Sequence, residues 1–338
     1  MKRKCAMLES ELNGRIGSLA LAGTIAMVGG LAAPAAANEN ARLNEDASFE
    51  TVLSQDQAGP PPGVPSGAGG PPPGVPFEKP VFDDTWATVG IGVGLVPSYS
   101  GSDDYRIFPL PLVVGRVAGV GISPNGPGFT LNFLSDDAPA GPPTGSQEPS
   151  FSFGPSFRFR NDRANQIQDD VVELAEPLDT ALEVGVSAGV SFPKVFNKGD
   201  RVSVSAGASW DILGAHSGMI LSPSVGYFTP IGKAASLQLS ASASIVDDDY
   251  ADYYYSVTPA QSGATGLAQF AADGGLESLG LTAIGTYDLD GNALNGGFSI
   301  YGIVGYSRLV GDAAETPFTS ERGSANQLFG GLGVAYTF

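Results

Sequence analysis

Apolar and small or polar side chains alternate along most of the chain after residue 85, and the last twelve residues show this pattern in its simplest form. Because side chains of an extended strand point alternately to opposite faces, this segment has one apolar face and one face of small residues. A free aromatic edge invites aggregation, so we expect this strand to pair with the first one and to close a β-barrel whose apolar face meets lipid. The barrel-closing apolar positions are Leu332, Val334, Tyr336 and Phe338, preceded by Leu328, and the small positions are Gly331, Gly333, Ala335 and Thr337.

The alternation predicts twelve strands, an even number that returns both ends of the barrel to one side of a membrane. The run 151–160 is the clearest, with phenylalanines on one face and Arg158 and Arg160 among the residues of the other. Pro109 and Pro111 weaken one strand, since proline is poorly tolerated inside a ladder, and the count is least constrained over 105–149. The predicted strands are 86–95, 107–114, 117–122, 129–134, 151–160, 182–192, 202–212, 219–228, 237–245, 279–289, 298–306 and 328–338.

Loop lengths indicate how this barrel inserts, because outer-membrane barrels have short periplasmic turns and longer extracellular loops. We expect 193–200, 229–234 and 290–292 to be periplasmic, and 161–179, 247–276 and 310–325 to be extracellular. Two connections break this rule, since 135–149 is long on the periplasmic side and 214–217 is short on the outer side. Aromatic residues near strand ends predict interfacial girdles; they are Trp86, Phe159, Trp210, Tyr227, Phe298 and Tyr336.

A secreted β-sandwich is the competing fold, because its strands also alternate. Its outward face would carry Lys, Glu and Thr, whereas the polar face here is mostly Gly and Ser, and charged residues make up only 15% of the chain. The pattern therefore favours an all-β fold, a closed antiparallel transmembrane β-barrel of about ten to twelve strands with a polar lumen.

Residues 1–37 are predicted to be a cleaved signal peptide. Basic residues at positions 2–4 precede an apolar run over 16–31, and Ala35-Ala36-Ala37 offers a cleavage site. A membrane-spanning helix is the alternative, but the run is short, contains glycine and is followed by Pro34. The protein is therefore expected to be exported, with the cell outer membrane of a Gram-negative bacterium as its location.

Residues 38–84 are predicted to form a disordered periplasmic tether ahead of the barrel domain, 85–338. This stretch repeats the motif Gly-Pro-Pro-Pro-Gly-Val-Pro at 59–65 and 70–76. Proline cannot donate to a ladder and favours extended polyproline geometry, while the glycines interrupt it. A docking peptide for a partner domain is the alternative interpretation.

Charge and cysteine content exclude several kinds of chemistry. The formal net charge is −18, and the first 37 residues hold four basic and two acidic side chains, so the remainder carries −20. Such an acidic chain does not suit nucleic acid as a partner. The single cysteine, Cys5, lies in the predicted leader, so the exported chain is expected to have no disulfide or zinc–thiolate site, and no cofactor is predicted.

Six stretches in register make the chain resemble the MipA/OmpV family of outer-membrane proteins from about residue 85 to the end. The resemblance implies an outer-membrane barrel, and the name-giving member is a scaffold that joins a lytic murein transglycosylase to a bifunctional penicillin-binding protein. Other members are implicated in permeability, adhesion or antibiotic response, so the resemblance implies location better than role. The stretches are Gly101-Ser-Asp-Asp-Tyr-Arg106 with Pro109-Leu-Pro111, Phe153-Gly-Pro-Ser156 with Arg160 and Arg163, Gly214-Ala-His-Ser-Gly218, Asp248-Asp249-Tyr250, Tyr306-Ser-Arg-Leu309 with Gly311-Asp-Ala313, and Asn326-Gln327 to Phe338.

The candidate contact residues lie in predicted extracellular loops. Clustered carboxylates can hold Ca²⁺ or Mg²⁺, but no EF-hand spacing is present, and a solvated acidic rim is favoured over a metal site. The tyrosines after Asp249 either pack on their own loop or form a partner-binding patch. His216, the only histidine, is expected to hydrogen-bond within its loop, because one tight hairpin cannot easily orient a catalytic triad. The candidates are Asp103, Asp104, Tyr105, His216, Asp248, Asp249 and Tyr250.

Arg158 and Arg160 are predicted to face the lumen, with Glu183 and Asp211 as neighbours. Polar pairs that fill the barrel are favoured over a selectivity filter. We therefore expect a non-enzymatic envelope scaffold, with a narrow channel for small solutes as the alternative. Expected partners are outer-membrane lipid and lipopolysaccharide, the barrel-assembly machinery (whose recognition signal the C-terminal strand resembles), and murein hydrolase or synthase proteins.

Overall fold

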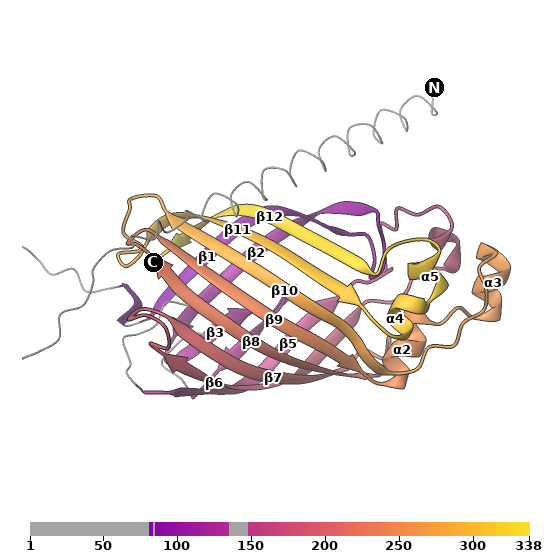
Figure 1. Cartoon of the computed structure of the whole chain (residues 1–338), viewed down its shortest axis with the longest axis horizontal. Helices are drawn as coiled ribbons and strands as arrows, with labels where there is room; N and C mark the ends of the chain where they lie inside the picture. The colour runs from indigo at the N-terminus through magenta and orange to yellow at the C-terminus, as the bar shows by residue number, and fades with distance from the viewer. Residues whose placement is uncertain (1–80, 84, 135–147) are drawn as a thin grey trace, which may run out of the picture.

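The computed structural model describes residues 81–83, 85–134 and 148–338, and it shows a closed antiparallel barrel (Figure 1). Each strand pairs with its neighbour in the chain, and β12 pairs with β1, which removes the free edge of the C-terminal strand. The predicted twelve-strand barrel is confirmed. Its strands are β1 (Trp86–Pro97), β2 (Tyr105–Val117), β3 (Val120–Pro124), β4 (Gly128–Asn132), β5 (Ser150–Arg160), β6 (Ala181–Pro193), β7 (Arg201–Asp211), β8 (Met219–Ile231), β9 (Ala235–Val246), β10 (Gly275–Asp288), β11 (Gly297–Leu309) and β12 (Asn326–Thr337).

The strand faces follow the sequence pattern, with aliphatic side chains outside and small side chains inside. On β12, Val334 is 52% exposed and Phe338 just beyond it is 62% exposed, whereas Ala335 is buried. Gly333 lies opposite Gly92 of β1, and these two glycines leave room for the ring of Tyr301 from β11. The Tyr301 hydroxyl reaches across to donate to the backbone oxygen of Leu110 on β2 at 2.7 Å. Small residues at the closing seam therefore allow one tyrosine to link β11 to β2.

The predicted girdle is correct except at Trp86. Phe159, Trp210, Phe298 and Tyr336 are between 44% and 62% exposed on the outer face. Trp86, in contrast, is only 3% exposed and packs edge-on against Phe82 and beside Val114. The reason is strand parity: Trp86 is an odd number of residues from the outward-facing Val89 and Ile91, so it points to the opposite face.

The short strands expected at 117–122 and 129–134 form a hairpin, β3 and β4, whose bounds differ slightly from the expected ones. Val117 ends β2, and β3 and β4 have only five residues each. Because of this, β2 pairs with β3 only over residues 115–117, and β4 pairs with β5 only over residues 128–130. Pro109 and Pro111 are tolerated inside β2 because they lie in the part that has no registered β3 partner.

One end of the barrel carries the β6–β7 and β8–β9 turns, the start of β1 and the end of β12, and we call it the terminal end. The other end, the cap end, carries the long loops, which contain short helices (Figure 1). The described helical segments are η1 (Val81–Asp83), η2 (Val172–Ala175), α2 (Asp248–Tyr255), α3 (Pro259–Thr265), α4 (Asp312–Glu315) and α5 (Pro317–Ser320). Within the described ranges, no helix has the length and apolar character needed to cross a membrane.

The predicted leader, 1–37, and most of the predicted tether, 38–84, lie outside the described residues. Of the tether, η1 is described, and Phe82 packs beneath Trp86 at the terminal end. The Val81 N–H also donates to the backbone oxygen of Leu294 in the β10–β11 turn at 3.0 Å. The chain is therefore attached to the barrel just before the first strand begins.

Candidate functional site

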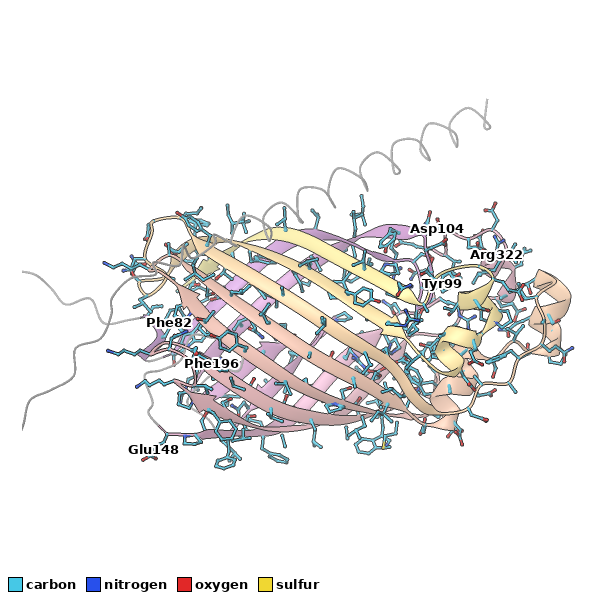
Figure 2. The ribbon with its side chains drawn as sticks, viewed as in Figure 1. Phe82, Tyr99, Asp104, Glu148, Phe196 and Arg322 are labelled. Carbon is cyan, nitrogen blue, oxygen red and sulfur yellow. The ribbon has the colours of Figure 1, made fainter. Side chains whose placement is uncertain are left out.

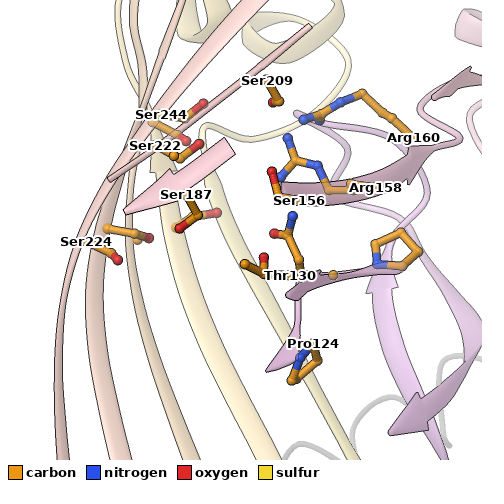
Figure 3. Close-up of a pocket in the computed structure, with 18 of the residues that line it drawn as sticks. Pro124, Thr130, Ser156, Arg158, Arg160, Ser187, Ser209, Ser222, Ser224 and Ser244 are labelled. Carbon is orange, nitrogen blue, oxygen red and sulfur yellow. The ribbon is translucent and has the colours of Figure 1, made fainter. Parts of the chain in front are cut away.

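The barrel encloses a cavity of about 800 Å³ whose lining is dominated by serine hydroxyls (Figure 3). The serines come from successive strands because each strand places its small polar positions on the inner face. Ser187, Ser209 and Ser224 illustrate this arrangement on β6, β7 and β8. Neutral hydroxyls donate and accept hydrogen bonds, so this lumen suits water or a polar group without selecting strongly for charge.

Charge enters the lumen at the cap end as one carboxylate held by two arginines. Glu183 on β6 lies opposite Arg158 on β5, and its side chain is fully buried. Arg158 Nη2 is 2.5 Å from Glu183 Oε2, and Arg160 Nε is 2.6 Å from Oε1. Each carboxylate oxygen thus accepts from a different guanidinium, which is the charge-assisted geometry that compensates burial. The predicted pairing of the two arginines with Glu183 is what the structure shows.

Asp211 has a different role from the one expected. It lies opposite Glu183 in the β6–β7 register, but its carboxylate accepts from backbone N–H groups of the following turn. Oδ1 accepts from Leu213 at 3.0 Å, and Oδ2 accepts from His216 at 3.0 Å and from Ser217 at 3.2 Å. Asp211 therefore organises the β7–β8 turn instead of pairing with an arginine.

His216 is buried under the cap and not displayed on the surface, so it makes contacts within its loop and offers none to an outside partner. Its Nδ1 accepts from the Gly218 N–H at 3.1 Å, which is the hydrogen bond within the loop that we expected. Its Nε2 lies 3.6 Å from Glu183 Oε1, and its ring meets Tyr250 edge-on with centroids 5.0 Å apart. The tight turn directs the ring inward, where it covers the buried carboxylate.

Tyr250 is also buried, which agrees with packing on its own loop and leaves none of this side chain exposed to a partner. Helix α2 begins after Asp247, whose side chain accepts from the Tyr250 N–H, and it turns Tyr250, Tyr254 and Tyr255 into the barrel mouth. The hydroxyls of Tyr250 and Tyr255 both donate to Glu277 Oε1, at 2.9 and 2.6 Å. Burial raises the pKa of Tyr250 far above its ordinary value, so this hydroxyl stays protonated as a donor.

These groups form one connected cluster, which we call the cap network: Arg160, Glu183, His216, Tyr250 and Glu277. The guanidinium carbon of Arg160 lies 5.2 Å from the centre of the Tyr250 ring, and this contact joins the Glu183 pair to the Glu277 pair. Glu277 was not among the predicted site residues. The available signal was a carboxylate at the start of a strand whose neighbours are otherwise small or apolar.

The predicted acidic rim is exposed, and in one of its two parts a carboxylate also makes a local hydrogen bond. Asp103 and Asp104 are exposed in the β1–β2 loop and Tyr105 is exposed at the start of β2 (Figure 2 labels Asp104). Partial burial and the neighbouring Asp103 raise the pKa of Asp104. Asp248 and Asp249 are exposed on α2, and Asp248 accepts from the Gly274 N–H at 2.8 Å. Within the described ranges, no three metal-ligating side chains gather in one place.

A second contact holds the cap together and was also absent from the predicted site. Arg322, after α5, donates to both oxygens of Asp169, at 2.7 and 3.3 Å. Burial favours the neutral form of Asp169, but the hydrogen bonds from Arg322 and from the N–H groups of Val172 and Val171 outweigh it, so its pKa is lowered. The residues are 153 positions apart, which explains why spacing gave no indication of the pair.

Replacing Arg322 with alanine is expected to loosen the contact between the β5–β6 and β11–β12 loops only modestly, because the arginine is partly exposed and solvent screens the ion pair. Since the pKa of Asp169 is lowered in the folded chain, this stabilisation is present above the ordinary aspartate pKa and is lost as pH falls through the lowered value. Limited proteolysis of the loops against pH measures this: cleavage should rise in acid, and Arg322→Ala should raise it already at neutral pH. Arg308→Ala is the control, because the Arg308 guanidinium donates to Asn326 on the outer face, away from the Asp169 contact. Equal cleavage of the two variants would contradict the expectation.

A closed barrel with an apolar outer face, a polar lumen and aromatic residues near both strand ends defines an outer-membrane β-barrel protein. Residues 89–338 match the family described as MltA-interacting protein MipA, and the chain belongs to this family. The resemblance stated from the sequence is thereby confirmed.

Among solved structures, the chain is similar to an outer membrane channel from Pseudomonas putida F1, at 13% identity over 75% of this chain and 96% of that one, with a TM-score of 0.38. It is also similar to an anion-selective porin from Comamonas acidovorans, at 10% identity over 75% of this chain and 98% of that one, with a TM-score of 0.31. Likeness this distant carries no argument about function. No curated protein matches the chain.

Proposed function

We propose that this barrel is a non-enzymatic interaction protein of the outer membrane that scaffolds murein-processing enzymes. The observation that supports this best is the closed cap end, where Tyr250, Tyr255 and Phe318 are 2% exposed or less. A mouth packed in this way does not favour free flow of solute through the lumen. The family to which the chain belongs takes its description from interaction with a protein, MltA.

The surface that we assign to such a partner is the terminal end, which faces the periplasm in this proposal. Its turns carry the three lysines of the described chain, Lys194, Lys198 and Lys233, whereas exposed carboxylates crowd the cap end. Phe196, between two of these lysines, is 76% exposed (Figure 2). An exposed aromatic residue surrounded by cations fits a partner with an acidic, partly apolar surface.

Enzymatic chemistry has little support at the one histidine. A hydrolase needs a nucleophile beside an oriented base. In the described chain, the His216 ring accepts one hydrogen bond, from the Gly218 N–H to Nδ1, while Nε2 has no hydrogen-bond partner and lies 3.6 Å from Glu183 Oε1, so no hydroxyl is bonded to either ring nitrogen. Its surroundings instead resemble a packed structural core.

Affinity capture tests the scaffold. The mature chain, solubilised in neutral detergent, should retain an MltA-type lytic transglycosylase, and replacing Lys194, Lys198 and Lys233 with glutamate should abolish most of that retention because it reverses the local charge. Replacing Asp248 and Asp249 with lysine at the cap end is the matched control and should leave retention unchanged. If neither set of substitutions changes retention, the terminal end is not the binding surface. If the unchanged chain retains no transglycosylase, the scaffold function is rejected.

A narrow channel is the second candidate, favoured by the serine-lined cavity of about 800 Å³. If the barrel is a channel, either the loops of the cap end move apart or small solutes pass beside them. Planar-bilayer recording distinguishes the two functions, since stable current steps support a channel and their absence supports a closed scaffold.

A further inference from the structure

The barrel wall is incomplete beside β2 in its cap-end half. The β3–β4 hairpin pairs with β2 only from Gly115 to Val117, and then it turns back at 125–127. From Tyr105 to Val114, therefore, the edge of β2 that faces β3 has no registered partner in the described chain, although its other edge pairs with β1 throughout. Unpaired backbone is costly in hydrocarbon, so this edge must be met by water or by a ligand.

The cavity of the lumen reaches this break in the wall. Its lining includes Arg106 and Phe108 on β2, Gly126 and Pro127 at the hairpin tip, and Phe159 at the end of β5. These five residues, which we call the window rim, belong to three separate segments that surround the place where wall strands are missing. At the cap end of this break, β2 is joined to the β5–β6 loop by hydrogen bonds: Arg106 Nη1 donates to Asn165 and Gln166 at 3.3 to 3.4 Å.

The two sides of the window differ in polarity. On the lipid side, Ile107 is 58% exposed, Phe129 is 43% exposed and Phe159 is 51% exposed. On the lumen side, three buried polar atoms have no hydrogen-bond partner in the described chain, namely Arg106 Nε, Ser123 Oγ and Gln327 Oε1. All three residues line the cavity. Among the described residues, Arg106 donates to neutral amide oxygens and has no carboxylate partner, unlike Arg158 and Arg160.

We propose that the window admits a single-chain amphiphile with an anionic head from the bilayer into the lumen. The head lies near Arg106 and the lumen hydroxyls, and the chain leaves between β2 and the hairpin tip toward lipid. The arginine supplies charge-assisted hydrogen bonds, and the apolar rim contacts the chain. This site does not depend on whether the terminal end binds murein enzymes, so either proposal can fail alone.

A single-cysteine reporter tests the site, because the exported chain has no native cysteine if cleavage falls after Ala37. Asn125→Cys places a fluorophore at the hairpin tip, and Asn295→Cys places one in the β10–β11 turn at the terminal end as the control. The protein is reconstituted in phosphatidylcholine vesicles, and chain-brominated dodecanoate is added as quencher at alkaline pH, where its head is ionised. We expect saturable quenching at position 125, reversed by unlabelled dodecanoate, and only weak linear quenching at position 295.

Arg106→Gln should weaken the apparent affinity about tenfold or more, the loss expected of one charge-assisted contact. Arg308→Gln, on the outer face, should not change it, and gel mobility with and without heating shows that both variants fold. Three outcomes overturn the proposal: linear quenching at both positions, unchanged affinity in folded Arg106→Gln, or equal competition by dodecyltrimethylammonium.

Discussion

Replacing Glu183 with glutamine is expected to destabilise the barrel by about 3–5 kcal/mol, the cost of removing one partner of a buried ion pair. The carboxylate is fully buried and accepts from both Arg158 and Arg160. Without its charge, two guanidinium groups remain close together in the cap end with no compensation. Urea unfolding followed by tryptophan fluorescence measures the loss, because Trp210 lies at the cap end of β7, beside the Glu183 register.

Glu173→Gln is the matched control, since Glu173 lies exposed on η2 and should change stability by less than about 0.5 kcal/mol. The double variant Glu183→Gln with Arg160→Gln should recover part of the lost stability, because it removes one of the two uncompensated charges. Equal unfolding midpoints for Glu183→Gln and Glu173→Gln would show that the pair contributes nothing beyond solvation. If the double variant loses as much stability as the two single variants together, or more, the two residues are not coupled in the way expected.

The strands and their faces were predictable because each depends on a local period of two. A phenylalanine at 151 or 159 and a serine at 152 or 156 lie on opposite faces whatever strand pairs beside them. The pairing of Glu183 depended instead on register: Arg158 lies directly opposite it, and so does Asp211 on the other side. The sequence predicted both Glu183 and Asp211 as neighbours of the arginines. The geometry of the turn after β7 determines that Asp211 instead accepts from backbone N–H groups.

The cap helices were missed although part of their signal is present in the sequence. Thr258, Pro259 and Gln261 form a capping box with proline at the first position of α3, and Asp247 caps α2. Reading those residues as helix starts would have turned the tyrosines into one buried face, since positions 250 and 254 are four apart. The long-range contacts of Glu277 and Arg322 had no local signal, because they join segments that meet only when the barrel closes.

The window in the wall also has a partial signal, in the prolines at 124 and 127 that flank the β3–β4 turn. They limit the hairpin to five residues a side, because neither can donate to a ladder beyond the turn. Pro109 and Pro111 weakened the prediction of the strand at 107–114, and in the structure they lie in the part of β2 without a registered β3 partner. These four prolines thus lie beside the part of β2 that has no registered β3 partner.

Replacing Gly333 with alanine is expected to cost about 2–4 kcal/mol, because it combines overpacking with a lost hydrogen bond. A Cβ at this position would stand 2.4 Å from the Tyr301 ring carbon Cζ and 2.5 Å from its hydroxyl. The ring would have to leave the groove over β12 and β1, and its hydroxyl would lose the Leu110 oxygen, 2.7 Å away on β2. Urea unfolding in phosphatidylcholine vesicles gives the change in stability.

Gly207→Ala is the matched control, because Gly207 also lines the lumen and an added Cβ would meet its nearest neighbour, the Val186 oxygen, at 3.6 Å. That substitution should stay within about 0.5 kcal/mol of the parent. In the double variant Gly333→Ala with Tyr301→Ala, the new methyl group no longer meets a ring. The loss of stability in the double variant should therefore be smaller than the sum of the losses in the two single variants. Full additivity, or equal losses at 333 and 207, would mean that Tyr301 does not link β11 to β2 and that the small residues of the closing seam serve only the strand pairing.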